Sequence, residues 1–170
     1  MQSVKWNEGL FTPSKIICVG RNYAAHIAEL NNETPTSMVL FAKPNSAITD
    51  SLNSEHLGEA LHFETELCFL VKNKQLAAVG LGLDLTKRGL QSTLKEKGLP
   101  WERAKAFNGS ALFTEFVVVN SNLHYQFSLK IDGKDTQLGD TRLMLHNAEQ
   151  ILAEISEFMD LEDGDIIMTG

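Results

Sequence analysis

Leu61-His-Phe-Glu-Thr-Glu-Leu-Cys-Phe-Leu-Val71 places two carboxylates, Glu64 and Glu66, inside an otherwise apolar stretch. Side chains alternate between the two faces of a strand, so these two glutamates point the same way, about 7 Å apart, with Thr65 on the opposite face. Neighbouring carboxylates repel each other, and burying them is costly unless a cation neutralises them. The stretch therefore predicts either a cation site built on a strand or the solvated face of an edge strand.

The sequence around this stretch predicts a strand-rich protein with few helices. Short apolar runs that end at Gly, at Lys43-Pro44 or at the hairpin signal Asp132-Gly133 indicate strands, and Gly80 and Gly82 interrupt one such run. Strands are expected at residues 15–20, 38–42, 61–71, 76–85, 116–119 and 125–131, just before Gly139, and from 163 onward. Apolar spacings of three and four predict helices at residues 22–30, 90–97 and 148–158.

Length and composition limit the classes of protein that this chain can be. With 170 residues, 43% of them hydrophobic, it is expected to form one domain over residues 1–170. A net charge of −7 argues against a nucleic-acid partner. The sequence lacks a run of ~20 apolar residues and a signal-peptide pattern, so we expect a cytoplasmic protein with no membrane partner. Cys18 and Cys68 lie in apolar runs and are expected to be buried rather than to form a disulfide or a zinc site.

His26 and Glu29 lie three residues apart in a segment with helical spacing, so their side chains share a face. A carboxylate that accepts from one imidazole nitrogen leaves the other nitrogen to take a proton from water or a carbon acid. The alternative is an ordinary surface His–Glu pair. Lys105 is a further cation beside aromatic residues and is a candidate site residue. The alternative is that Lys105 is a solvated lysine on a helix.

Asp84 follows a strand-like run and supplies a third carboxylate to go with Glu64 and Glu66. Asp84 is predicted either to cap the following helix or to complete an all-oxygen triad. Three hard oxygen ligands suit Mg²⁺ or Mn²⁺ and leave positions for water and substrate. Arg88 and Gln91 would then be planar donors for a carboxylate or carbonyl oxygen.

Seven motifs, taken in order, resemble those of the fumarylacetoacetate hydrolase family, over nearly the whole chain after about residue 14. The resemblance is closest to its small acylpyruvate hydrolase, oxaloacetate decarboxylase and oxaloacetate tautomerase branch. The motifs are Gly20-Arg-Asn-Tyr-x-x-His26-x-x-Glu29, Leu40-Phe-x-Lys-Pro44, Glu64-x-Glu66-Leu, Asp84-Leu-Thr-x-Arg88-x-x-Gln91, Trp101-x-x-Ala-Lys105-x-Phe107, Asp132-Gly-x-x-x-Gln137 and Gly164-Asp-Ile-Ile-Met-Thr-Gly170.

The resemblance implies an α+β fold whose mixed sheets roll into a barrel-like domain with a short helical lid. It implies that Glu64, Glu66 and Asp84 bind Mg²⁺, with Mn²⁺ or Ca²⁺ as substitutes, and that Lys105 stabilises an enolate or oxyanion. His26 and Glu29 match the base dyad on the lid. The residues that it implies to bind substrate are Arg21, Asn22, Arg88, Gln91 and Thr169.

The activity implied is that of a metal-dependent hydrolase acting on C–C bonds of small 2-oxo acids, most simply acylpyruvates. Oxaloacetate decarboxylation or keto–enol tautomerisation would use the same enolate. The alternatives are an isomerase or decarboxylase of aromatic catabolism, acting on 2-oxo-hept-ene-dioate-type substrates, and an inactive metal-binding relative. A homodimer is expected by resemblance.

Four features depart from the pattern of the family. Asn108 stands where relatives usually have Asp, and Gly89 replaces a frequent Asp after Arg88. Both changes are expected to affect substrate preference. The connection between Val71 and Ala78 is short, and the sequence ends at Gly170, where relatives continue. The domain is therefore expected to be truncated at its C-terminus.

Overall fold

The glutamate-bearing stretch forms one half of a long β-hairpin. Strand β7 (His62–Lys72) pairs antiparallel with β8 (Gln75–Thr86) along its whole length. The two residues between them, Asn73 and Lys74, have positive φ angles of 51° and 59°. Two central residues with positive φ make the tight turn that matches the twist of paired strands. The short connection noted in the sequence is therefore a two-residue hairpin turn.

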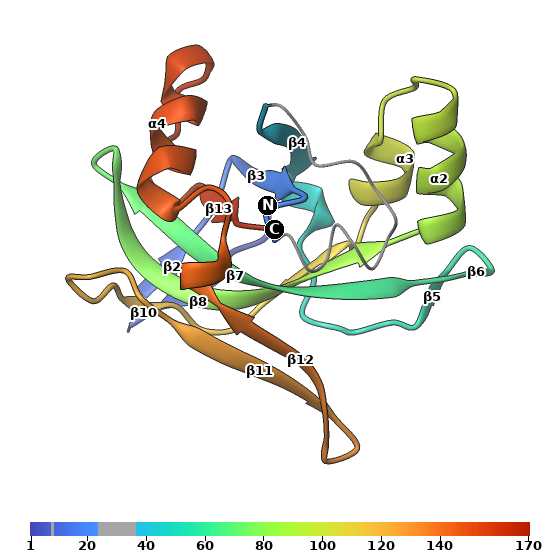
Figure 1. Ribbon diagram of the computed structural model, residues 1–170, viewed down its shortest axis with the longest axis horizontal. Helices are drawn as coiled ribbons and strands as arrows, with labels where there is room; N and C mark the ends of the chain where they lie inside the picture. Colours follow the sequence, from blue (N-terminus) through green and yellow to red (C-terminus); the bar gives the residue numbers. More distant parts are fainter. Residues whose placement is uncertain (8, 24–36) are drawn as a thin grey trace.

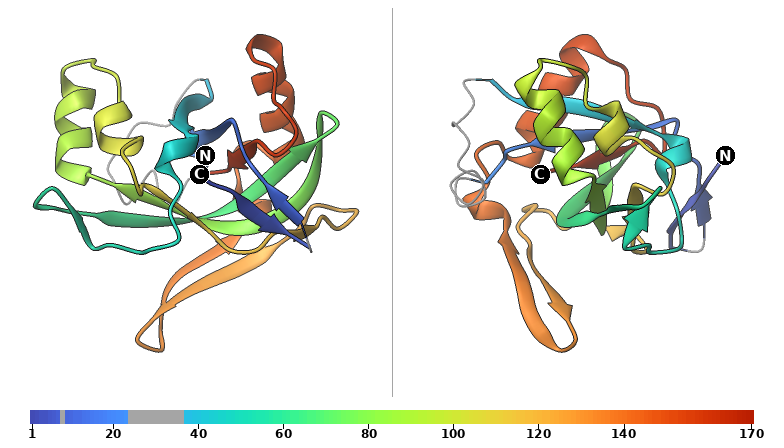
Figure 2. Two further views of the ribbon diagram at one scale, coloured as in Figure 1. Left: turned by 180° about the vertical axis from the view of Figure 1, so that it is seen from behind. Right: turned by 90° about the vertical axis from the view of Figure 1, so that its right-hand side faces the viewer.

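The structure, a computed structural model, describes residues 1–7, 9–23 and 37–170 and is built around one strongly curved mixed sheet with few helices (Figures 1 and 2). The strand order is β10-β8-β7-β13-β3-β4, with β9 also paired to β8. The pairing of β13 with β3 is parallel, and the other pairs are antiparallel. The remaining strands of this sheet are β3 (Lys15–Gly20), β4 (Val39–Pro44), β9 (Ala111–Phe113), β10 (Val117–Val118) and β13 (Ile166–Met168).

Three two-stranded ribbons and a few helices surround the curved sheet. The ribbon of β11 and β12 projects away from the body, while α2 and α3 lie together at one end and α4 at the other (Figure 1). The ribbon strands are β1 (Val4–Trp6), β2 (Gly9–Phe11), β5 (Glu55–His56), β6 (Glu59–Ala60), β11 (Gln126–Ile131) and β12 (Lys134–Asp140). The helices are η1 (Asn45–Ala47), α2 (Arg88–Glu96), α3 (Glu102–Lys105), η2 (Thr141–Leu143) and α4 (Ala148–Phe158).

Strand β7 is a central strand, since it lies between β8 and β13. Its residues from Thr65 to Val71 are all buried. Cys68 and Leu70 pack into the core on one face, and Leu67 and Phe69 pack on the other. The alternative of a solvated edge strand is therefore wrong, because a strand covered on both faces and both edges carries the two glutamates.

Several boundaries differ from the sequence-based expectation for physical reasons. The strand expected to end before Lys43-Pro44 continues through both residues. Pro44 is the last residue of β4, and the side chain of Lys43 is buried. The strand expected at residues 76–85 is β8, which runs through Gly80 and Gly82; a Cβ on Gly82 would lie 2.7 Å from the Cys68 Sγ, so glycine permits close packing there. The strand expected at 116–119 is only Val117–Val118. The helix expected at residues 22–30 lies largely outside the described residues.

Other expectations are confirmed. Cys18 and Cys68 are both free and buried, and burial raises the pKa of each thiol well above its usual value. The hairpin at Asp132-Gly133 joins β11 to β12. The expected helices match α2 and α4 to within two residues. Among the described residues, no helix combines the length and apolar character needed to cross a membrane.

Candidate active site

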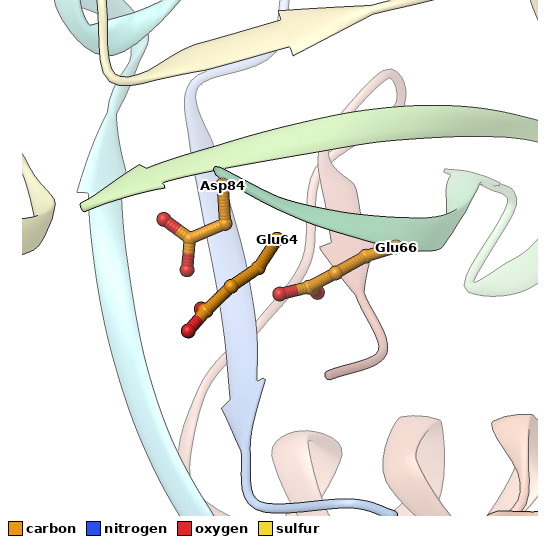
Figure 3. A group of neighbouring side chains, drawn as sticks. All are labelled: Glu64, Glu66 and Asp84. Carbon is orange, nitrogen blue, oxygen red and sulfur yellow. The ribbon is translucent and has the colours of Figure 1, made fainter. Parts of the chain in front are cut away.

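The β7–β8 hairpin brings three carboxylates to one place. Glu64 is the cross-strand partner of Asp84, and Glu66 follows two residues later on the same face as Glu64. One carboxylate oxygen from each residue lies within 4.8 Å of the others. Figure 3 shows the three side chains converging on one side of the hairpin. Asp84 belongs to β8 and not to a helix cap, because α2 is preceded by Lys87 at its N-cap, so the alternative role for Asp84 is wrong.

Two of the three carboxylates are removed from water. Glu66 is 3% exposed and Asp84 is fully buried. Burial raises the pKa of the Glu66 carboxyl well above its usual value, and the nearby charges of Asp84 and Glu64 raise it further. The Gly170 amide opposes this shift by donating to Glu66 Oε2 at 2.8 Å. This cluster of negative charge is stabilised by any cation placed between the carboxylates.

Lys105 is such a cation and is nearly buried. Its ammonium donates to Glu64 Oε2 at 2.7 Å, to Asp84 Oδ2 at 2.6 Å and to Thr86 Oγ1 at 2.7 Å. Burial alone would lower the pKa of Lys105, but the charges of Asp84 and Glu64 outweigh burial and raise it. Lys105 is therefore a buried member of the cluster, and its alternative as a solvated helix lysine is wrong.

Lys43 is a second buried cation, to which the sequence motifs gave no role. Its ammonium donates to the carbonyl oxygens of Lys105 and Ser110 and to the Ser110 hydroxyl, and it lies 2.9 Å from Asp84 Oδ1. The Lys43 side chain is fully buried. The sequence signal that could have identified Lys43 is its position in the apolar run before Pro44, because a lysine inside a buried strand requires a partner of opposite charge.

The donor set fits a divalent cation. All three side chains offer carboxylate oxygen, the ligand that Mg²⁺ and Mn²⁺ prefer. Asp84 Oδ1 is buried and has no hydrogen-bond donor among the described residues, since its contact with Lys43 is an ion pair outside hydrogen-bond geometry. A buried carboxylate oxygen without a donor is suited to a metal ion. Glu64, Glu66 and Asp84 could therefore hold such an ion.

A cavity of about 570 Å³ opens onto the three carboxylates. Arg88 and Gln91 line it from α2, and Arg88 donates both to Glu64 Oε1 and, at 3.1 Å, to Gln91 Oε1. Arg21, which directly follows β3, also lines the cavity and has a positive φ of 62°. The structure thus brings the predicted residues Arg21, Arg88 and Gln91 together around the carboxylates.

Asn22 and Thr169 lie behind the cavity wall rather than on it. Asn22 is buried, and its amide donates to the carbonyl oxygens of His146 and Thr169 and accepts from the His146 amide. The Thr169 hydroxyl donates to the Leu67 carbonyl oxygen at 2.9 Å. These contacts fix the loop that carries Arg21 and the turn that carries Gly170. His26 and Glu29 fall outside the described residues, so their predicted role stays a prediction.

Three further residues line the cavity, and the sequence motifs assigned no role to them. The Tyr23 hydroxyl is buried and has no hydrogen-bond partner within the described part of the chain, and burial, Glu66 and Asp140 raise its pKa to about 12. The Gln137 side chain pairs with the backbone of Thr65, accepting at 3.0 Å and donating at 2.6 Å, which ties β12 to β7. Lys95 lies one turn beyond Gln91 on α2; its spacing of seven from Arg88 was the signal that could have identified it.

Comparisons with known proteins agree with this geometry. The family model "Fumarylacetoacetate (FAA) hydrolase C-terminal" matches residues 15–170. The chain is 33% identical over 189 residues to the oxaloacetate tautomerase YcgM of Escherichia coli, covering 99% of this chain and 86% of that protein. It is 37% identical over 205 residues to the mitochondrial oxaloacetate tautomerase FMP41 of Saccharomyces cerevisiae, covering 92% and 79%.

A solved structure extends the likeness to three dimensions. The fumarylpyruvate hydrolase of Pseudomonas aeruginosa, solved with Mn²⁺ and pyruvate, superposes with a TM-score of 0.89 at 27% identity, covering 98% of this chain and 82% of that one. The curved mixed sheet and few helices match this neighbour. This chain belongs to the fumarylacetoacetate hydrolase family.

Proposed function

We propose that this protein is a divalent-metal-dependent enzyme that interconverts the keto and enol forms of oxaloacetate. The observation that carries the proposal is the buried oxygen triad of Glu64, Glu66 and Asp84 beside the Lys105 ammonium, at the floor of a cavity lined with cations. The names of the two tautomerase relatives support this reaction over others of the family.

The triad would hold Mg²⁺ or Mn²⁺. When bound, the ion supplies Lewis acidity toward the carboxylate and carbonyl oxygens of a 2-oxo acid. The fumarylpyruvate hydrolase neighbour carries Mn²⁺, which supports a metal of this kind here. Both Mg²⁺ and Mn²⁺ take oxygen ligands in octahedral geometry, so either ion is compatible with three carboxylates.

The residues of the chain supply binding, charge and proton transfer. The Lys105 ammonium, held by Glu64 and Asp84, would stabilise negative charge that develops on the oxygen at C2. Arg88 and Gln91 orient the substrate with planar donors. The His26–Glu29 dyad predicted from the sequence would take a proton from C3 and return it to the C2 oxygen, so that the keto form becomes the enol form without any net change in atoms or electrons.

Hydrolytic C–C cleavage of an acylpyruvate is the second candidate, and the pyruvate bound to the fumarylpyruvate hydrolase neighbour is the observation that favours it. In this reaction the His26–Glu29 dyad would activate water for attack on the distal carbonyl, which releases the enolate of pyruvate and a carboxylic acid. Oxaloacetate decarboxylation would release CO₂ and the same enolate. The three reactions therefore share Lys105 and differ in what the dyad does.

The test follows the ultraviolet absorbance of enol-oxaloacetate as it converts to the keto form. We expect catalysis by wild type with Mg²⁺, loss on chelation, and a loss of at least about 100-fold in Glu66→Gln. His26→Ala should lose about 10²–10⁴-fold. Glu96→Gln, at the exposed end of α2, is the matched control and should retain full activity. Full activity of Glu66→Gln would overturn the proposal, and product analysis with acetylpyruvate decides between tautomerisation and hydrolysis.

The assembly and location of the protein are also proposals. We propose a homodimer, which light scattering during size-exclusion chromatography would test. A mass equal to one chain across the assay concentration range would contradict it. A cytoplasmic location stays a prediction, as do the small 2-oxo acid as partner and the absence of nucleic-acid and membrane partners.

A further inference from the structure

The pairing of β13 with β7 ends just before β7 reaches the two glutamates. The last paired residue of β7 in this direction is Cys68, and the Thr169 amide adds one further bond by donating to the Leu67 carbonyl oxygen at 3.1 Å. Residues two apart on a strand present their backbone groups to the same edge, so Thr65 faces the same edge as Leu67. The edge of β7 at Thr65 therefore lies beyond the end of β13.

The side chain of Gln137 pairs with this edge in the manner of a neighbouring strand. The Thr65 amide donates to Gln137 Oε1 at 3.0 Å, and Gln137 Nε2 donates to the Thr65 carbonyl oxygen at 2.6 Å. A side-chain amide offers the same acceptor and donor as a peptide group, so it can take the place of one residue in a paired strand. Gln137 belongs to β12 and lies 72 residues farther along the chain, so the contact joins distant parts of the fold.

Thr65 stands between two carboxylates of the metal triad. Its N–H belongs to the peptide plane that contains the Glu64 Cα, and its C=O belongs to the plane that contains the Glu66 Cα. Because peptide planes are rigid, hydrogen bonds to both groups restrain the positions of the two glutamate Cα atoms. Mg²⁺ demands near-ideal octahedral geometry, so it gains from ligands whose backbone is held in place.

Strand β12 also forms a wall of the cavity. Its residues 136–140 line the cavity together with Glu64 and Glu66. On the neighbouring strand of the ribbon, Phe127 packs against the buried cluster that contains Leu67. Gln137 therefore adds a polar link, directly beside the triad, to the apolar contact that attaches the ribbon to β7.

We propose that Gln137 is a positioning residue for the metal site. By pairing with the backbone of Thr65, it holds Glu64 and Glu66 in the arrangement that a divalent cation requires. The inference rests on the proposed function, since it presupposes that the triad binds a metal ion. It adds that one side chain of the cavity wall holds the strand that carries two of the three carboxylates.

Mn²⁺ titration followed by electron paramagnetic resonance measures the effect of this contact on the triad. Gln137→Met keeps the length of the side chain and removes both hydrogen bonds. We expect it to raise the Kd for Mn²⁺ by about 10-fold, the lower end of the range for residues that orient metal ligands. An equal Kd in wild type and Gln137→Met would overturn the positioning role.

Gln126→Met is the matched control. Gln126 is an exposed glutamine of the same ribbon, on β11, and its amide donates to Asp140 at 2.8 Å rather than to β7. Its replacement should change the Kd for Mn²⁺ by less than about twofold, as for other surface substitutions. An equal rise of the Kd in Gln126→Met and Gln137→Met would also overturn the proposal, because it would trace the effect to the ribbon as a whole.

Two readouts separate positioning from a purely structural role. If Gln137 served only to attach the ribbon, Gln137→Met would unfold at a lower temperature and bind Mn²⁺ as wild type does, and this result would overturn the proposal. A positioning role instead raises the Mg²⁺ concentration needed for tautomerisation. Saturating Mg²⁺ should then return kcat to within about threefold of wild type, because mass action compensates for a weaker site.

Amide hydrogen exchange in the wild type tests the same coupling without a variant. Coupling is reciprocal, so a metal ion in the triad should stabilise the contact that favours its binding. We expect saturating Mg²⁺ to slow exchange of the Thr65 amide by about 10-fold. The Ile131 amide, near the turn of the ribbon, should change by less than about twofold, because it exchanges by local opening. Unchanged exchange at Thr65 with Mg²⁺ bound would overturn the proposal.

The Kd for Mn²⁺ is measured without turnover, which keeps this inference distinct from the proposed function. If wild type binds Mn²⁺ but does not tautomerise oxaloacetate, the proposed function fails, while the ratio of the Kd values of Gln137→Met and wild type still decides the role of Gln137. If wild type tautomerises oxaloacetate and this ratio is one, the positioning role fails and the proposed function is unaffected.

Discussion

Two buried lysines determine how the carboxylate of Asp84 is held. Lys105 donates to Asp84 Oδ2 at 2.6 Å, and Lys43 lies 2.9 Å from Asp84 Oδ1. Lys43 also donates to the carbonyl oxygen of Lys105 and to Ser110, so it positions the residue that carries the second ammonium. Lys43 is thus a positioning residue: it does not line the cavity, and it acts through Asp84 and Lys105.

Lys43→Met should destabilise the protein strongly. The substitution keeps the length of the side chain but leaves the buried carboxylate of Asp84 and the two carbonyl oxygens without this cation. Breaking a buried charge pair from one side costs about 3–5 kcal/mol in the free energy of unfolding. Urea unfolding measures this loss, and Lys5→Met, at an exposed position, is the control that should change it by less than ~0.5 kcal/mol. Equal stability of the two variants would contradict the role of Lys43.

The sequence predicted the meeting of the three carboxylates better than it predicted their surroundings. Alternation on a strand placed Glu64 and Glu66 on one face, and the motif around Asp84 supplied the third carboxylate. The burial of Lys43 could not be predicted, because it depends on Ser110 and Lys105, which are more than 60 residues away in sequence. The same holds for Asn22 and Thr169, whose side chains donate to the backbone carbonyl oxygens of Thr169 and of Leu67 on β7, respectively.

The β7–β8 hairpin is the element on which the site is built, and its glycines allow the strands to pack closely. A Cβ at Gly82, the cross-strand partner of Glu66, would lie 2.7 Å from Cys68 Sγ and 3.0 Å from the ring of Phe113. In the sequence this glycine appears only as a break in the apolar pattern of the expected strand. In the structure Gly82 leaves room for side chains of β7 and β9. The local sequence pattern cannot show this, because the atoms that would clash with a Cβ at Gly82 belong to those two strands.

Gly82→Ala and Gly89→Ala should change stability in opposite directions. Overpacking at Gly82 forces Cys68 or Phe113 to move and costs about 1–3 kcal/mol. Gly89 lies in the first turn of α2 with open space around its Cβ position, so alanine there should stabilise the fold by about 0.5–1 kcal/mol through helix propensity. Thermal unfolding measures both changes. A Gly82→Ala variant as stable as wild type would contradict the close packing of the hairpin.

At the scale of the whole molecule, the first and last strands of the sheet are joined. β3 and β13 pair in parallel, and Asp165 fixes their starting ends. Its carboxylate accepts from the Ser14 amide at 2.7 Å, the Lys15 ammonium at 2.7 Å and the Glu162 amide at 2.9 Å. Burial would raise the pKa of Asp165, but these hydrogen bonds outweigh burial and lower it. A parallel pairing of such distant segments cannot be predicted from periodicity alone.

Asp165 should make stability depend on pH in the acid range. Because its folded pKa lies below the value of about 3.9 for an unfolded aspartate, its contribution is fully present above about pH 4 and is lost as the pH falls through the folded pKa. Asp165→Asn removes the charge and should lower the free energy of unfolding by about 2–3 kcal/mol at pH 6. The difference between wild type and Asp165→Asn should shrink at pH 3. A difference that stays constant between pH 6 and pH 3 would show that Asp165 does not carry this dependence.

Binding of a divalent cation by the oxygen triad of the hairpin can be measured by Mn²⁺ titration followed by electron paramagnetic resonance. We expect one Mn²⁺ per chain in wild type and in the exposed control Glu96→Gln, with affinity at least about 10-fold weaker in Glu66→Gln, because one of the three carboxylates is lost. Equal Mn²⁺ affinity in wild type and Glu66→Gln would contradict binding by the triad.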